Sequence, residues 1–151
     1  MAWMIIRVRG TIHARRDIVE TLARLHLVRP NHATVVPEAP SFKGMITKVQ
    51  GYVTWGEADA ETVGLLVRER GRPPAGSSIA PPGPPAPAPA DAAPVVETVL
   101  AHGLASAPGL RPLFRLRAPK GGWRSTKKPF ASGGALGYRG RAINDLARKM
   151  L

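Results

Sequence analysis

The stretch RPNHATVVPEAPSFKGMITKVQGYVTWGE, residues 29–57, decides how this chain folds. Residues 33–36 and residues 52–55 are short runs rich in β-branched and aromatic side chains, with proline or glycine close by, as strands are. Between them, Met45 and Val49 recur at helical spacing, and the lysines of the segment lie on the other side. The stretch therefore predicts a strand, a short helix and a second strand.

The alternation of strands and helices continues on both sides of this stretch. Residues 3–9 alternate in polarity, which predicts a half-buried strand with Arg7 and Arg9 on its open face. Residues 14–25 and residues 59–70 place apolar side chains at helical spacing, so each predicts an amphipathic helix. Strands and helices that alternate over so few residues imply an α+β domain, a small sheet with helices packed on one face.

Composition divides the chain into three parts. Residues 1–71 are the expected core domain and carry a net charge of +3, from 10 basic and 7 acidic side chains. Residues 72–94 hold nine of the 16 prolines, which predicts a stiff linker or insertion. The PxxP spacing within residues 81–85 leaves open a role as ligand for a proline-binding groove, although the spacer interpretation is favoured. Residues 95–151 carry 11 basic and 2 acidic side chains, a net charge of +9.

We expect this last part to be a basic extension packed on the core. Pro94 is well placed to begin a helix, and residues 113–117 alternate as a fourth strand does. A glycine-rich loop follows, and residues 141–151 predict a closing helix with one apolar stripe. The net charge of the whole chain is +12, and such a charge favours RNA, DNA or anionic lipid as partner.

The glycine-rich segment KGGWRSTKKPFASGGALGYRGR, residues 120–141, combines six cationic side chains with no acid. Trp123, Phe130 and Tyr138 are interleaved among the cations. Cations neutralise phosphates, aromatic rings stack on unpaired bases, and glycine lets the backbone come close. We expect an RNA-contacting loop that contributes nothing to the core. The alternative is a solvated basic loop whose aromatic side chains pin it to the domain.

The sequence argues against an enzyme. It has no cysteine, its four histidines lie at no metal-binding spacing, and its glycines match neither a dinucleotide-binding nor a P-loop motif. His13 and Asp17 have the i,i+4 spacing of a base and its orienting acid, but helix-start polar residues are the better interpretation. We therefore expect no catalysis, no cofactor, no metal and no small-molecule substrate. No apolar run approaches the length of a membrane span, so we expect no membrane partner.

Two groups of polar residues in the core are candidates for binding phosphate and ribose. Arg29, Asn31 and His32 gather at the entrance of a predicted strand, where such groups suit phosphate and 2′-hydroxyl contacts. Lys43 and Lys48 lie at the start of the predicted helix and one turn further on. Either group could equally be a turn or a solvated helix face.

The chain resembles a known family at these residues. RPNHATVVPE followed by FKGMITKVQGYVTWGE is similar to the large-subunit ribosomal protein thirty family, and the second half resembles its archaeal and eukaryotic branch. The matching positions of that half are Leu116, Pro119, Lys120, Gly121, Gly122, Lys127, Phe130, Gly133, Gly134, Gly137, Arg139, Ile143, Leu146 and Met150. The resemblance implies a three-stranded antiparallel sheet of ferredoxin-like, split βαβ type, with a C-terminal helix, strand, loop and helix added. It also implies a structural protein of the cytoplasmic ribosome.

The partners implied are large-subunit rRNA of the 23S type, with 5S RNA possibly near, and neighbouring ribosomal proteins. The resemblance assigns RNA contacts to Arg29, Asn31, His32, Lys43, Lys48, Lys120, Lys127 and Arg139. The chemistry of their side chains adds Arg7, Arg9, Arg15, Arg16, Arg124, Lys128 and Arg141. Two rival functions stay open: a chromosomal or regulatory DNA-binding protein, for which no helix concentrates base-reading side chains, and an RNA-processing hydrolase that uses His13 or His32.

Overall fold

A computed structural model of the chain describes residues 1–72, 89–107 and 109–151, with only the backbone of residues 89–92. Its six-stranded sheet has the order β4-β2-β1-β3-β6-β5. The strands are β1 Ala2–Arg7, β2 His32–Pro37, β3 Val53–Glu57, β4 Phe114–Arg115, β5 Ser125–Pro129 and β6 Gly134–Tyr138. The helices are α1 Arg16–Arg24, α2 Pro40–Val49, α3 Ala60–Arg70, α4 Pro89–His102 and α5 Ala142–Met150, with two short 3-10 turns, η1 Leu104–Ser106 and η2 Phe130–Ser132.

The centre of the sheet is the expected three-stranded antiparallel unit. β1 lies between β2 and β3 and runs antiparallel to both, with Ile5 opposite Thr34 on one side and Trp55 on the other. The expectation of a three-stranded sheet with one added C-terminal strand is wrong in its strand number, because the C-terminal part adds a strand at each edge and a further one beyond. β4 pairs with β2 antiparallel, whereas β6 pairs with β3 and β5 with β6 in parallel.

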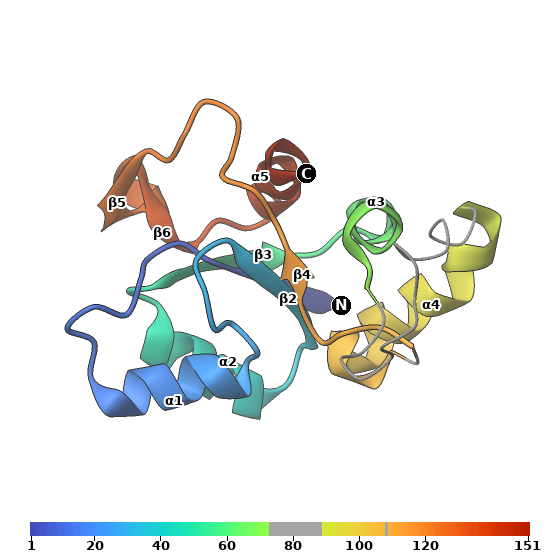
Figure 1. Cartoon of the computed structure of the whole chain (residues 1–151), viewed down its shortest axis with the longest axis horizontal. Helices are drawn as coiled ribbons and strands as arrows, with labels where there is room; N and C mark the ends of the chain where they lie inside the picture. The colour runs from blue at the N-terminus through green and yellow to red at the C-terminus, as the bar shows by residue number, and fades with distance from the viewer. Residues whose placement is uncertain (73–88, 108) are drawn as a thin grey trace.

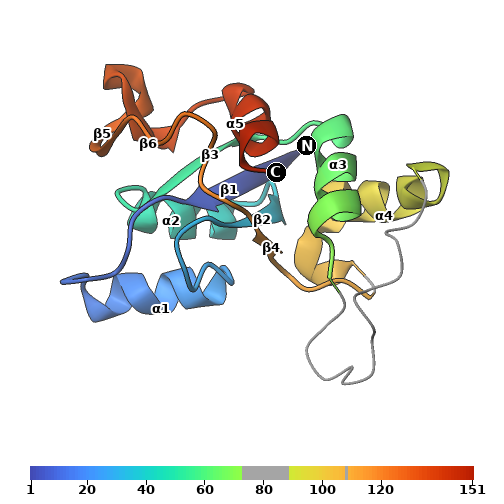
Figure 2. The ribbon, with the colours of Figure 1, turned by 45° about the horizontal axis from the view of Figure 1, so that its top comes forward.

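Helices cover both faces of the sheet, which corrects the expectation of one covered face (Figure 1). α1 and α2 pack on the face that carries Trp3 and Ile5, whereas α3, α4 and α5 pack on the face that carries Met4 and Ile6. Figure 2 shows the same two layers of helices with the sheet between them. β1 is consequently buried at all six of its positions. The strand that alternation predicted to be half exposed is therefore the centre of the molecule.

The glycine-rich segment is ordered into the strand pair β5–β6 with η2 between them, and it contributes to the core. Ala135 and Leu136 are buried beside Val8 in a small apolar cluster of their own. A Cβ atom on Gly134 would lie 1.9 Å from the carbonyl oxygen of Lys128, so the close approach of the two strands requires glycine there. The expectation that this segment builds no core is wrong, since Ala135 and Leu136, between two glycines, are buried on the added strand β6.

The helix α4, which precedes β4, begins earlier in the chain than the position of Pro94 suggested. α4 starts at Pro89, so Pro94 lies inside the helix and not at its first position, and the expected linker overlaps the first turns of α4. The rest of that linker, with its PxxP spacing, lies outside the described residues. At the chain's end α5 buries the predicted stripe, with Ile143 and Met150 fully enclosed, against β3 and α3.

Candidate nucleic-acid interface

One end of the sheet collects the polar residues that the sequence singled out. β1 ends there and β2 and β3 begin there, so Arg7 lies opposite Val53 and close to Asn31, whose backbone N–H donates to the Arg7 carbonyl oxygen at 2.8 Å. On the outer side of β2, His32 lies opposite Arg115 of the edge strand β4. Segments that are far apart in the sequence therefore meet at this edge.

Arg7 does not face solvent, and this burial argues against the RNA contact expected of it. Its side chain is buried against the α1 and α2 layer, and its guanidinium donates hydrogen bonds to three backbone carbonyls. Nε donates to Arg9 at 2.9 Å, and Nη1 donates to Leu27 at 2.8 Å and to Val28 at 2.6 Å. Burial lowers the pKa of the Arg7 guanidinium from its ordinary value. Arg7 thus holds the connection between α1 and β2 in place.

Asn31 and His32 carry polar atoms that the fold leaves without a partner. Among the described residues, neither Oδ1 of Asn31 nor Nδ1 of His32 has a hydrogen-bond partner, although both atoms are buried within half-buried side chains. Asn31 has a left-handed backbone, with φ of 66°, and its carbonyl accepts a hydrogen bond from the Leu116 N–H. An unpaired buried polar atom is costly in a folded protein, so each of these atoms calls for a further partner, either a water molecule or a ligand group. A ribose 2′-hydroxyl is a suitable one, because it both donates and accepts.

The imidazole of His32 is surrounded by positive charge. Burial, and then the charges of Arg115, Arg29 and Arg7, lower the pKa of His32. A neutral imidazole can accept a hydrogen bond, whereas a protonated one cannot. Arg29 and Arg115 are exposed, so they can reach phosphate oxygens on either side of a ribose held at His32.

Arg115 is a candidate contact that the sequence assignments missed. The alternation of residues 113–117 already placed Arg115 on the outward side of a strand, but its neighbour could not be known without the pairing of β4 with β2. Arg9, which the sequence analysis assigned as an RNA contact, is exposed at the same end of the sheet. Its guanidinium lies 5.3 Å from the Tyr52 ring centroid and donates to the Gly51 carbonyl at 3.4 Å. We call Arg9, Arg29, Asn31, His32 and Arg115 the basic sheet end.

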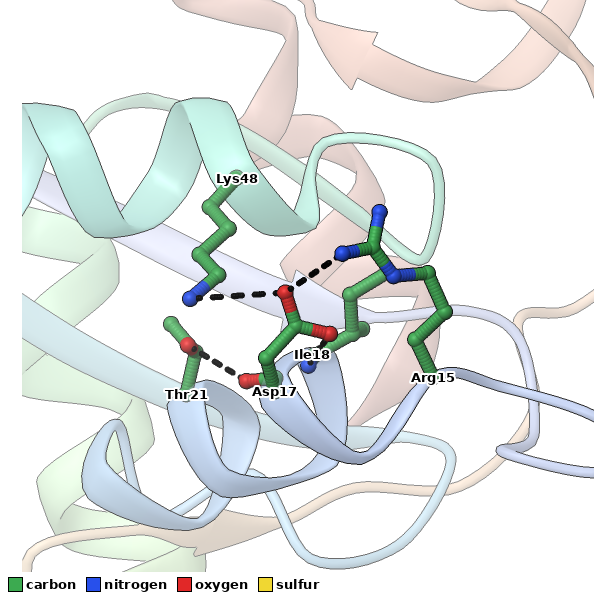
Figure 3. A network of polar contacts seen from close by, with 5 residues as sticks. All are labelled: Arg15, Asp17, Ile18, Thr21 and Lys48. Carbon is green, nitrogen blue, oxygen red and sulfur yellow. Dashed lines mark hydrogen bonds and ion pairs between the residues drawn. The ribbon is translucent and has the colours of Figure 1, made fainter.

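Two cations near α1 are partly neutralised by one carboxylate. The Oδ2 atom of Asp17 forms two ion pairs, one with Nη2 of Arg15 at 3.3 Å and one with Nζ of Lys48 at 3.7 Å, as Figure 3 shows. Its other oxygen accepts the Ile18 N–H at 3.0 Å, a donor at the start of α1 that also reaches the Arg15 carbonyl at 3.1 Å. Asp17 therefore pairs with these cations and not with His13.

Two further core cations complete the assigned set near these helices. Arg16 pairs with Glu20 at 3.3 Å, whereas Lys43 is exposed and has no ion pair within the described ranges. A cation that is already paired with a carboxylate attracts a phosphate less strongly. Lys43 is therefore a stronger candidate for a phosphate contact than Arg16.

In the C-terminal extension the assigned cations divide into two kinds. Arg139 turns inward: its Nε donates to Thr54 Oγ1 at 2.7 Å, one Nη donates to the Ala135 carbonyl at 2.8 Å, and its guanidinium lies 4.7 Å from the Phe130 ring centroid. Burial lowers the pKa of Arg139 to about 10, so it stays charged at neutral pH. The remaining cations are exposed and have no ion pair in the part of the chain that the structure describes. They are Lys120, Arg124, Lys127, Lys128 and Arg141.

The aromatic side chains of the extension also differ from one another. Tyr138 is tied to the sheet, because its hydroxyl donates to a Glu57 carboxylate oxygen and its ring lies 4.7 Å from that of Trp55. Trp123 is half buried against the apolar clusters, whereas Phe130 is 40% exposed. The rings therefore both anchor the extension and, at Phe130, leave a face for a ligand.

The part of the chain that the structure describes holds no cluster of three or more metal-ligating side chains. Within that same part, no helix has the length and hydropathy that a membrane crossing requires.

Comparison with known proteins accounts for this arrangement. The family model described as Ribosomal protein L30p/L7e matches residues 3–53. The protein called large ribosomal subunit protein uL30 in Methanosphaera stadtmanae is 41% identical to this chain, over 99% of both chains. The chain belongs to the uL30 family. The uL30 proteins of Methanococcus vannielii and Methanopyrus kandleri are 42% and 39% identical, over 100% and 95% of this chain and 100% and 99% of their own lengths.

The uL30 similarity covers both groups of candidate contacts. The basic sheet end up to His32 lies within the L30p/L7e match, whereas Arg115 and the extension lie outside it. They fall instead within the nearly full-length similarity to the uL30 relatives. The residues of the added strands β4, β5 and β6 therefore lie within the sequence that this chain shares with these uL30 proteins.

Proposed function

We propose that this protein is a structural, non-catalytic component of the large subunit of the cytoplasmic ribosome, and that it binds rRNA. The observation that carries the proposal is the 41–42% identity to uL30 proteins over 99–100% of both chains. These relatives are named as large ribosomal subunit proteins, and a protein of the same length and family fits the same place.

The basic sheet end is the first proposed contact. Arg29 and Arg115 neutralise phosphates on either side, while the free acceptors of Asn31 and His32 receive hydrogen bonds from ribose hydroxyls. This combination favours RNA over DNA, because deoxyribose lacks the 2′-hydroxyl that the two acceptors need. Lys43, Lys48, Arg15 and Arg16 on α1 and α2 would add weaker phosphate contacts.

The extension is the second proposed contact. Its exposed cations lie on β5 and on the loops beside it and have no carboxylate partner among the described residues, so their positive charge is available to a backbone of phosphates. Lys127 and Lys128 also keep the edge strand β5 from pairing with another chain. Arg139 would act mainly by fixing Phe130 and β6.

We further propose that the RNA is of the 23S type, that 5S RNA lies near, and that neighbouring ribosomal proteins contact the remaining surface. A protein with helices on both faces of its sheet can contact RNA at one end and proteins at its helical sides. α4 carries no lysine or arginine and none of the residues of the basic sheet end, which leaves that helix for a protein neighbour.

Sedimentation of cell lysate through a gradient tests the assembly. We expect the protein to migrate with the large subunit at moderate salt and to be partly released at high salt, since phosphate contacts weaken as salt rises. A protein that stays at the top of the gradient in low salt would contradict the proposal. Competition between large-subunit rRNA and duplex DNA then tests the DNA-binding alternative, which predicts that both compete equally.

A further inference from the structure

A cavity of about 430 Å³ lies between the extension and α5, apart from the basic sheet end. Its walls come from the loop that contains Lys120 and Trp123, from the turn between β5 and β6, and from the exposed side of α5. This size falls within the range of pockets that bind small ligands. Gly122 and Gly133 lie in its wall without side chains, so the backbone itself can approach a flat ligand.

Two aromatic side chains line the cavity. Trp123 is half buried, so its ring is held in position, and Phe130 is 40% exposed. The guanidinium of Arg139, 4.7 Å from the Phe130 ring centroid, is itself fixed by its hydrogen bonds to Thr54 and Ala135. Rings held in this way are the common means of stacking an unpaired base.

Positive charges surround the same cavity. Lys120, Arg124 and Lys149 line it, and none of them has an ion pair among the residues described. The loop is joined to the helix by a hydrogen bond from the Lys120 N–H to the Lys149 carbonyl, at 3.1 Å. The phosphates on both sides of a bound base would therefore find cations on both sides of the cavity.

Asp145 is the one acidic residue in the lining. It is exposed in the first turn of α5, and it has neither an ion pair nor a side-chain hydrogen bond with any described residue. A carboxylate repels phosphates, so it is unexpected in a cavity that binds only the RNA backbone. It accepts hydrogen bonds, however, and guanine presents two adjacent donors, N1–H and the 2-amino group, on its Watson–Crick edge. The other three bases present fewer adjacent donors on that edge.

We propose that this cavity takes one unstacked guanine of a single-stranded RNA segment. The base stacks on Trp123 and Phe130, its Watson–Crick edge donates to Asp145, and its flanking phosphates contact the three surrounding cations. The inference rests on the proposed RNA-binding function and adds to it a single-stranded partner and a base preference.

Affinities of the full chain for four RNA pentamers test the site. The pentamers are UUGUU, UUAUU, UUCUU and UUUUU, and we expect the first to bind about tenfold more tightly than the others. Asp145→Asn removes a negative charge and the pair of acceptors. It should therefore reduce the guanine preference to less than twofold while raising the affinity for UUUUU. A Phe130→Ala variant should lose about tenfold in affinity for every pentamer, because stacking is lost whatever the base.

Glu97→Gln is the matched control, since it makes the same change of charge on α4, outside this cavity. It should keep the guanine preference. Equal binding of all four pentamers, or a preference that survives Asp145→Asn, would overturn the guanine site. If no pentamer binds while large-subunit rRNA does, the site is also overturned but the proposed function stands. If neither binds, the proposed function fails with it.

Discussion

The backbone N–H of Asn31 donates a 2.8 Å hydrogen bond to the carbonyl oxygen of Arg7, where β1 ends and β2 begins. The guanidinium of the same arginine reaches back to the carbonyls of Leu27 and Val28, in the connection that leads to Asn31. Arg7 therefore fixes this connection at both ends. The left-handed backbone of Asn31, and with it the position of its side chain, therefore depends on a buried arginine.

Replacing Arg7 by alanine should destabilise the fold. The change removes the hydrogen-bond donors of three buried or partly buried carbonyls and a large buried side chain, so we expect the free energy of unfolding to fall by about 3 kcal/mol. Urea unfolding measures this loss. Arg9→Ala is the matched control, because Arg9 lies on the same strand's extension but is exposed.

The control should behave in the opposite way. Arg9→Ala should cost less than about 1 kcal/mol of stability, since it removes only an exposed contact with Tyr52. Its RNA affinity should nevertheless fall. If Arg7→Ala proves as stable as Arg9→Ala, the structural role assigned to Arg7 is wrong.

Much of the core could be predicted because its signals are local. The helical spacing of Leu22 and Leu25 and the alternation that turns Met4 inward depend only on residues nearby, and these three residues are buried as expected. The sequence did not predict, however, that helices cover both faces of the sheet. Trp3 and Ile5 are as apolar as Met4 and Ile6, a pattern typical of strands enclosed on both sides, but Arg7 and Arg9 outweighed it in the sequence interpretation.

The extension was predicted less well because its structure depends on distant partners. β6 is a strand only because it lies beside β3, where Thr54 and Gly137 are paired and Thr54 Oγ1 donates to the Gly137 carbonyl at 2.9 Å. Glycines and lysines in this stretch have low intrinsic strand propensity, so propensity alone favours a loop. The cavity beside Asp145 likewise forms only when α5 packs near the loop, which no spacing in the sequence indicates.

The protonation of His32 should make stability depend on pH. Its pKa is lowered in the folded state, so the unfolded chain binds a proton more readily, and stability rises with pH. We expect the free energy of unfolding to decrease as pH falls below about 6.5, the ordinary pKa of histidine. The measurement is urea unfolding between pH 5.5 and 7.5, compared with His32→Asn, which should show a smaller decrease.

A histidine far from the arginines provides the control for this comparison. His102, exposed at the end of α4, can be changed to glutamine without altering the charge around His32. The His102→Gln variant should follow the unmodified protein over this pH range. An unchanged pH dependence in His32→Asn would show that burial and the nearby arginines do not act on His32 as described.

The two exposed arginines around His32 should each contribute one phosphate contact. Arg29→Ala and Arg115→Ala should each lower the affinity for large-subunit rRNA and reduce the slope of log affinity against log salt by about 1. The double variant should reduce it by about 2. Arg68→Ala on α3 is the control, since Arg68 carries the same charge as Arg29 and Arg115 but lies away from the basic sheet end. An unchanged slope of log affinity against log salt for Arg115→Ala would show that β4 is not part of the RNA interface.

Two glycine-to-alanine changes should affect stability in opposite directions. A Cβ atom on Gly56 of β3 would lie 2.0 Å from the Gly140 carbonyl oxygen and 3.1 Å from Cγ2 of Ile143. Because β3 is held between β1 and β6, it cannot move away, and α5 must shift instead. We expect Gly56→Ala to lower the free energy of unfolding by about 3 kcal/mol.

Gly44 provides the contrast because it lies within α2 and a Cβ atom there would meet nothing within 4 Å. Alanine at this position restricts the unfolded chain and favours the helix, so Gly44→Ala should raise the free energy of unfolding by about 0.5–1 kcal/mol. Urea unfolding of the two variants side by side tests both signs. A stable Gly56→Ala variant would mean that α5 is not packed closely on β3, and the cavity that α5 helps to form beside Asp145 would then lose its wall.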